Sequence, residues 1–130
     1  MKKCILSTLF VGAVLVSSGA LAVDTAICSG ATTAGDGVTP ASGTAGTNFM
    51  VRPIPLKCSA NVWLQGTDGT GGAWYALGSA SVKGRTSYKS NTNGGAVSAH
   101  TFCAVAGSCT STDATTARTQ ANTEAAASSS

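Results

Sequence analysis

The chain has few large apolar side chains and few charged ones for a protein of 130 residues. Aromatic residues make up 5% of it and charged residues 10%. Beyond residue 22, only 19 residues are large and apolar, whereas 63 are Ala, Thr, Gly or Ser. A cofactor-binding α/β fold needs more length and richer strands, so that class is excluded. Several membrane spans are excluded as well, because the one long apolar run lies at the N-terminus. The length fits one small domain.

Patterns that carry catalysis or bind metal are also scarce. The chain has one histidine, His100, and its five acidic residues are scattered among turns and ends, whereas acid–base catalysis needs a carboxylate pair or an oriented histidine. A zinc site would have to combine His100 with Cys58, Cys103 and Cys109, which lack the usual paired C-x2-4-C spacing. The glycine-rich segment 68–72 has one carboxylate and no P-loop lysine. The sequence therefore predicts a non-enzymatic protein with no metal site and no cofactor.

Residues 1–22 have the layout of a secretory signal peptide. A positive start, Met1-Lys2-Lys3, precedes an apolar segment over 4–16, and Ala20-Leu21-Ala22 forms an A-x-A cleavage site before Val23. The apolar segment is shorter than the roughly 20 residues that span a bilayer. We therefore expect cleavage and export to the periplasm, cell surface or extracellular space of a bacterium, with no membrane attachment afterwards.

Removal of this segment leaves a nearly neutral chain. Residues 23–130 contain six cationic and five acidic side chains. Lys83, Arg85 and Lys89 lie close together, but phosphate-binding proteins carry longer basic stripes. We interpret this cluster as a solvated strand face and expect no nucleic-acid partner.

Four cysteines remain after cleavage, namely Cys28, Cys58, Cys103 and Cys109. An even number in a small exported chain is typical of two disulfides. Three pairings are possible, and the sequence alone does not choose among them. Our working hypothesis is Cys28–Cys58 with Cys103–Cys109, where Gly107 permits a tight turn in the short loop.

The segment 49–109 is predicted to form a disulfide-stapled β domain. Pro53 and Pro55 limit 49–56 to an edge strand or an extended connector. From Cys58 to Gln65, apolar and polar residues alternate as in a half-buried strand. A turn is expected over 66–72, further β structure over 73–89, a tight hairpin turn at 91–95, and another strand over 96–106. The fold class is therefore mainly β: a small antiparallel domain, meander- or sandwich-like, with about four strands across 49–106.

The two ends flanking this domain are predicted to be irregular. Residues 23–48 are rich in Gly, Thr and Ala and are expected to form an extended, flexible arm or an ordered loop, held at Cys28. Residues 110–130 contain no large apolar side chain. Ala117 to Ala127 are compatible with a frayed helix, but short isolated helices are marginal in water. We therefore expect a flexible or partner-ordered low-complexity tail.

Two functional hypotheses follow from this composition. The first is a structural subunit of a bacterial cell-surface or extracellular assembly, such as a filament or pilus, which self-associates because its own core is thin and its ends can order against neighbours. The alternative is a monomeric secreted binding module, adhesin- or inhibitor-like, that presents aromatic residues to a partner. The candidate interaction surface is then Trp63, Trp74 and Tyr75, although so few aromatics are also needed in the core.

Overall fold

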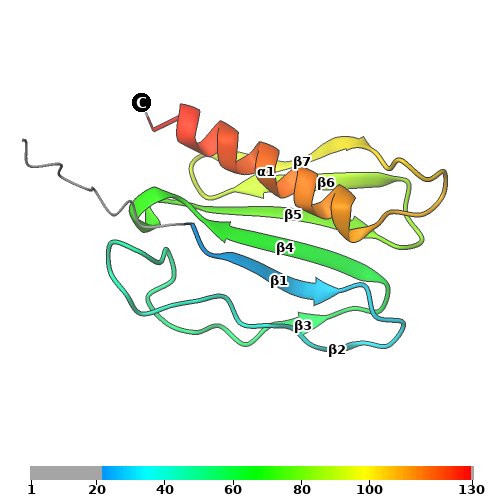
Figure 1. Ribbon diagram of the computed structural model, residues 1–130, viewed down its shortest axis with the longest axis horizontal. Coiled ribbons are helices and arrows are strands. Elements are labelled where there is room, and N and C mark those ends of the chain that lie inside the picture. Colours follow the sequence, from blue (N-terminus) through cyan, green and yellow to red (C-terminus); the bar gives the residue numbers. More distant parts are fainter. Residues whose placement is uncertain (1–21, 130) are drawn as a thin grey trace, which may run out of the picture.

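The computed structural model describes residues 22–129, so the predicted export signal lies outside the described residues apart from Ala22. Five antiparallel strands form the main sheet in the order β1-β4-β5-β6-β7, and helix α1 lies across one face of it (Figure 1). The strands are β1 (Asp24–Ser29), β2 (Gly35–Asp36), β3 (Lys57–Cys58), β4 (Val62–Asp68), β5 (Tyr75–Ser81), β6 (Thr86–Asn91) and β7 (Gly95–Phe102), and α1 spans Ser111–Ala127. The predicted mainly β class is confirmed.

Strands β4 to β7 form the expected antiparallel meander. The β6–β7 turn lies where the Asn-Gly sequence predicted it, with Gly94 at a φ of 84°. The side chain of Asn91 accepts hydrogen bonds from the backbone amides of Asn93 and Gly95, which closes the turn. The segment 49–56 is the connector rather than the edge strand. The predicted turn at 66–72 begins later than expected, because β4 continues to Asp68 before a 3-10 turn over Thr70–Gly72.

The expectation of a flexible arm over 23–48 is wrong for its first part. Residues 24–29 form β1, which pairs with β4 and lies at one edge of the main sheet. Ile27 and Cys28 of this strand are buried. The remainder runs through the two-stranded β2–β3 sheet, which lies beyond β1 in Figure 1. An arm tied in this way is part of the domain and is not a free strand donor.

The expectation of a flexible tail over 110–130 is also wrong. The described part of this segment forms α1, which packs against β5 and also contacts β4 and β6. The helix buries one face that consists of alanines and one arginine, namely Ala114, Ala117, Arg118, Ala121 and Ala125. The missing large side chains therefore do not prevent packing, since small ones bring the helix close to the sheet.

Small residues on β5 accept this close approach. Ala76, Gly78 and Ala80 alternate along the strand and face α1. A Cβ atom built on Gly78 would lie 2.1 Å from the carbonyl oxygen of Ala114. Trp74 and Trp63 supply the large side chains of this layer, one packed on Ala121 and Ala125 and the other on the cluster around Ala114. The close approach of the α1 and β5 backbones thus fills the core without the large side chains that the sequence lacks.

The opposite face of the sheet has its own smaller core. Ile27, Cys28 and Tyr75 are buried there, and they are covered by partly buried Met50, Leu56, Cys58, Leu64 and Leu77. The buried carboxylate of Asp68 accepts a hydrogen bond of 2.8 Å from the amide of Phe49. The long loop between β1 and β4 is therefore fixed over the β1–β4–β5 half of this face.

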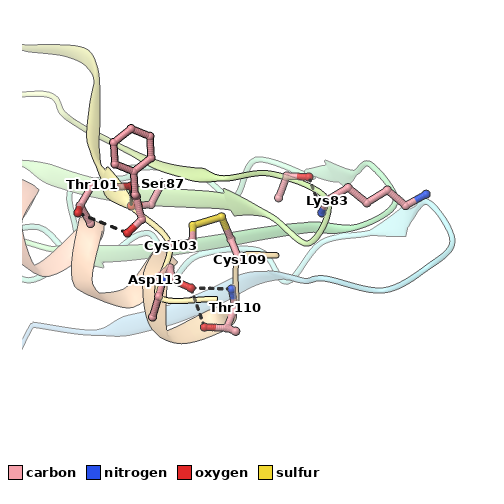
Figure 2. Close-up of a disulfide and its surroundings, with 10 residues drawn as sticks. Lys83, Ser87, Thr101, Cys103, Cys109, Thr110 and Asp113 are labelled. Carbon is pink, nitrogen blue, oxygen red and sulfur yellow. Dashed lines mark hydrogen bonds between the residues drawn. A yellow bond between two sulfur atoms is a disulfide. The ribbon is translucent and has the colours of Figure 1, made fainter. Parts of the chain in front are cut away.

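Both disulfides have the predicted pairing, Cys28–Cys58 and Cys103–Cys109. The first joins β1 to β3 and holds the long loop in place. The second closes a short loop after β7, directly before α1 (Figure 2). Two bridges in one small domain are typical of proteins from oxidising compartments.

Removal of the Cys28–Cys58 bridge is expected to destabilise the protein more than removal of the shorter one. The sequence separations are 30 and 6 residues, for which the chain-entropy relation gives losses of about 3.6 and about 2.2 kcal/mol. Urea unfolding of Cys28→Ala/Cys58→Ala and Cys103→Ala/Cys109→Ala proteins measures both. A larger loss from the short bridge would contradict the assignment of the long loop as the part that needs tethering.

Helix α1 begins at a capping box. The Asp113 carboxylate accepts hydrogen bonds of 2.8 Å from both the amide and the hydroxyl of Thr110 (Figure 2). These contacts, with the Thr110 amide foremost, outweigh a small burial effect and lower the pKa of Asp113 below its ordinary value. The carboxylate therefore stabilises the fold above the pKa that Asp has in the unfolded chain, about 3.9, and this contribution is lost as the pH falls through the lower folded value.

Asp113→Ala is expected to cost about 1 kcal/mol at pH 7, as for other lost helix caps. The difference from wild type should shrink as the pH falls below about 4, where Asp113 of the unfolded chain takes up a proton, and vanish below the lower pKa of the folded state. Urea unfolding at both pH values measures this. Asp36→Ala is the matched control, since its ion pair with Lys57 is exposed and should contribute little. An equal loss for Asp113→Ala at pH 7 and pH 2 would contradict the capping role.

Candidate functional site

Strand β7 forms one edge of the main sheet, and no other strand pairs with its outer side among the described residues. Its eight residues, GAVSAHTF, include no proline, lysine, arginine or carboxylate. Natural edge strands are usually protected by such residues or by a covering segment. The β6–β7 pairing is irregular near each end, while Ser98 and Ala99 keep paired partners in β6. The middle of β7 is therefore an open, uncharged edge.

Exposed apolar side chains accompany this edge. Val97 is 75% exposed and Phe102 81%, and Tyr88 of the neighbouring strand is also exposed. Tyr88 pairs with Ala99, and Thr86 pairs with Phe102.

Two hollows lie along this edge. A shallow depression on the face opposite α1 is lined by Val97, Tyr88, Leu64 and Leu77. An open hollow of about 360 Å³ lies beside Phe102, bordered also by Thr86 and Ala99 to Thr101. We call β7 together with Tyr88 the β7 edge surface.

The other edge of the sheet is covered. The carbonyl oxygen of Ile27 in β1 accepts a hydrogen bond of 2.9 Å from the amide of Val38. The amide of Gly37 bonds in turn to the carbonyl of Leu56, and the Cys28–Cys58 bridge ties the same region covalently. The two edges thus differ: β1 is shielded by its own chain, whereas no segment within residues 22–129 shields β7.

One end of the β7 edge surface is basic. The side chains of Lys83 and Arg85 lie in the β5–β6 turn and make no ion pair among residues 22–129. The carbonyl of Arg85 accepts a hydrogen bond from the amide of Cys103, which places this turn beside the end of β7. Figure 2 shows Lys83 extending away from the Cys103–Cys109 bridge. Three other cations differ, since Lys57, Lys89 and Arg118 pair with Asp36, Glu124 and Asp24 respectively, whereas Arg52 makes no ion pair within residues 22–129.

Arg118 of α1 forms an ion pair with Asp24 at the start of β1, with 2.6 Å between Nη1 and Oδ1. Partial burial raises the pKa of Asp24, but hydrogen bonds from Thr67 and Arg118 and the guanidinium charge together outweigh it, so the net shift is downward. Arg118 is itself buried. This pair belongs to the packing of the two chain ends against the sheet.

The three aromatic residues expected to form an interaction surface do not lie on one. Trp74 and Tyr75 are buried, at 6% and 2% exposure, and face opposite sides of the sheet. The indole nitrogen of Trp74 donates a hydrogen bond of 2.8 Å to the side-chain oxygen of Asn122 in α1. Trp63 is partly buried against the cluster of Ala80 and Ala114. Burial, aided by the nearby Asp68 carboxylate, raises the pKa of Tyr75 to about 12. Trp74 and Tyr75 are core residues and Trp63 packs against the core, so the three side chains do not form one exposed surface.

The candidate zinc ligands are not brought together as free donors. Cys58, Cys103 and Cys109 are all in disulfides, and His100 lies on β7. Within residues 22–129, no group of three or more histidine, cysteine or carboxylate side chains is arranged to hold a metal ion. In the same range no helix has both the length and the apolar character needed to cross a membrane.

Comparisons with known proteins return no match: no protein-family model, curated protein sequence or solved structure is similar to this chain.

Proposed function

We propose that this protein is an exported, non-enzymatic structural subunit of a bacterial cell-surface or extracellular assembly, and that it self-associates through the β7 edge surface. The proposal rests on the unprotected edge of β7. An open strand edge with unpaired N–H and C=O groups is a template for pairing with another chain. In this protein the edge also carries exposed apolar side chains, which favours association over hydration.

The contrast between the two sheet edges supports this interpretation. A monomer that needed no partner would be expected to shield both edges, yet among the described residues only β1 is shielded by hydrogen bonds and a disulfide. The ends of the chain no longer support self-association, because β1 and α1 are both built into the domain. We therefore propose association through the β7 edge and not through exchange of the two chain ends.

The test is the particle size of the mature protein, measured by sedimentation over a range of concentrations. We expect the wild type to form dimers or larger species. Val97→Lys introduces a charge of the kind that protects natural edge strands, and it should weaken association at least tenfold. Thr119→Lys is the matched control, since Thr119 lies exposed on α1, and this variant should associate like the wild type.

A wild-type protein that remains monomeric at every concentration would overturn the proposal. It would favour the secreted binding module, with Phe102 and Val97 rather than Trp63, Trp74 or Tyr75 presented to the partner. Equal weakening by both lysine variants would show that added charge, and not the β7 edge, controls association.

A further inference from the structure

We infer that the partner at the β7 edge is β7 of a second copy, paired antiparallel about a two-fold axis near Ser98, so that two five-stranded sheets join into one. This inference rests on the proposed function and specifies its geometry. Four features of the described residues carry it: the uncharged edge, the position of the basic residues, the distribution of large and small side chains along β7, and the place of α1.

The composition of β7 permits this strand to pair with β7 of a second copy. An interface related by a two-fold axis brings each surface against the same surface, so charged side chains on it would face like charges. The eight residues of β7 include no lysine, arginine or carboxylate. Ser98 and Ala99, which keep paired partners in β6, also provide a regular stretch on which a second strand can pair.

The basic residues select the antiparallel direction. Lys83 and Arg85 lie beside the Phe102 end of β7 and lack acidic partners among the described residues. Parallel pairing of two copies would bring four cationic side chains to the same end of the interface. Antiparallel pairing places Lys83 and Arg85 of one copy and those of the other at opposite ends of the interface. A strand of eight residues at roughly 3.4 Å each, together with the turn beyond it, separates the two groups by about 30 Å.

The side chains along β7 are complementary in the antiparallel direction. The strand begins with Gly95 and Ala96 and ends with Phe102, which is 81% exposed. In a pairing centred near Ser98, the Phe102 ring of each copy lies level with the small residues that begin the partner's strand. Aromatic side chains paired across from glycine on edge strands cover it and stabilise the sheet. Parallel pairing would instead place the two phenylalanines opposite each other.

Helix α1 does not obstruct this arrangement. It packs chiefly on β5, with fewer contacts to β6 and β4 and the fewest to β7, and none of these contacts is a pairing with the side of β7 that faces away from β6. A two-fold axis perpendicular to the sheet keeps both helices on one face of the joined sheet. On the other face, Tyr88, Val97 and Phe102 of the two copies form one continuous apolar strip.

The test is a distance measurement between spin labels in the associated protein. The labels are attached through an unnatural amino acid, so that both disulfides stay intact, at position 98 in one protein and at position 83 in a second. Adjacent antiparallel strands place paired Cα atoms about 5 Å apart, so labels at position 98 should lie within about 20 Å of each other. Labels at position 83 should lie at least about 30 Å apart.

Loss of the two-fold pairing and loss of self-association would give different results. Particles larger than a monomer with widely separated labels at position 98 would overturn the two-fold pairing and leave self-association standing. Short distances at position 83 would indicate parallel pairing and also overturn the inference. No coupling at either position, together with a monomeric mass, would overturn both. Circular dichroism of each labelled protein establishes that it remains folded.

Discussion

A protein that ends at Thr110 is expected to lose its cooperative fold. Helix α1 covers Trp74 and Ala76, which are 6% and 0% exposed. Burial of a tryptophan removes about 150–250 Å² from water, which at about 25 cal/mol per Å² corresponds to about 4–6 kcal/mol for Trp74 alone. Small domains have total stabilities of about 5–15 kcal/mol. Loss of the whole α1 layer should therefore remove most of the stability of this domain.

Thermal unfolding followed by circular dichroism measures this loss. The control is a chain that ends at Ala127, which keeps α1 and removes only contacts such as the hydrogen bond between Asn93 and Ser129. That chain should melt close to the wild type. A chain ending at Thr110 that still melts cooperatively within a few degrees of the wild type would show that α1 is not part of the core.

Gly78→Ala is expected to be the most damaging single-methyl substitution in the sheet. The added Cβ would lie 2.1 Å from the carbonyl oxygen of Ala114 and 2.3 Å from the amide nitrogen of Arg118. Both atoms belong to the backbone of α1, so the whole helix must move rather than one side chain. We expect a loss of about 3 kcal/mol, at the top of the usual range for overpacking.

Gly35→Ala is the matched control for this substitution. A Cβ on Gly35 meets nothing within 4 Å, and its backbone does not have a positive φ. Replacement of glycine by alanine at such a site is neutral or stabilising by up to about 1 kcal/mol. Urea unfolding of the two variants gives the comparison, and similar stabilities for both would contradict the close packing of α1 on β5.

The elements predicted correctly from the sequence are those set by local chemistry. The hairpin at 91–95 follows from the backbone preference of Asn-Gly, and the Cys103–Cys109 bridge agrees with the working hypothesis, in which Gly107 permits a tight turn. Helix α1 is longer and more firmly packed than the frayed helix over 117–127 that the sequence allows, because a count of large apolar residues overlooks packing by alanines. Ala114, Ala117, Ala121 and Ala125 recur at helical spacing, and Thr110 with Asp113 forms a capping box, so the pattern was present in small residues.

The candidate site depended on information that the sequence does not display. Phe102 and Val97 belong to a strand that was predicted, but their exposure results from its place at the edge of the sheet. Strand β7 lies at the edge because β1 pairs with β4 at the other side of the sheet and not with β7. This β1–β4 pairing joins distant parts of the chain. Likewise, Trp74 and Tyr75 are buried because a helix covers one face of the sheet and the long loop covers the other. Sequence patterns indicate strands more readily than their order.

Amide hydrogen exchange as a function of protein concentration tests self-association through β7 most directly. Exchange is compared between dilute and concentrated mature protein, with the helix as an internal reference. We predict that amides of β7 become more protected at high concentration, because their outer N–H groups pair with a second chain, while those of α1 do not change. Exchange of β7 that is independent of concentration, or protection that rises equally in α1, would contradict association through this edge.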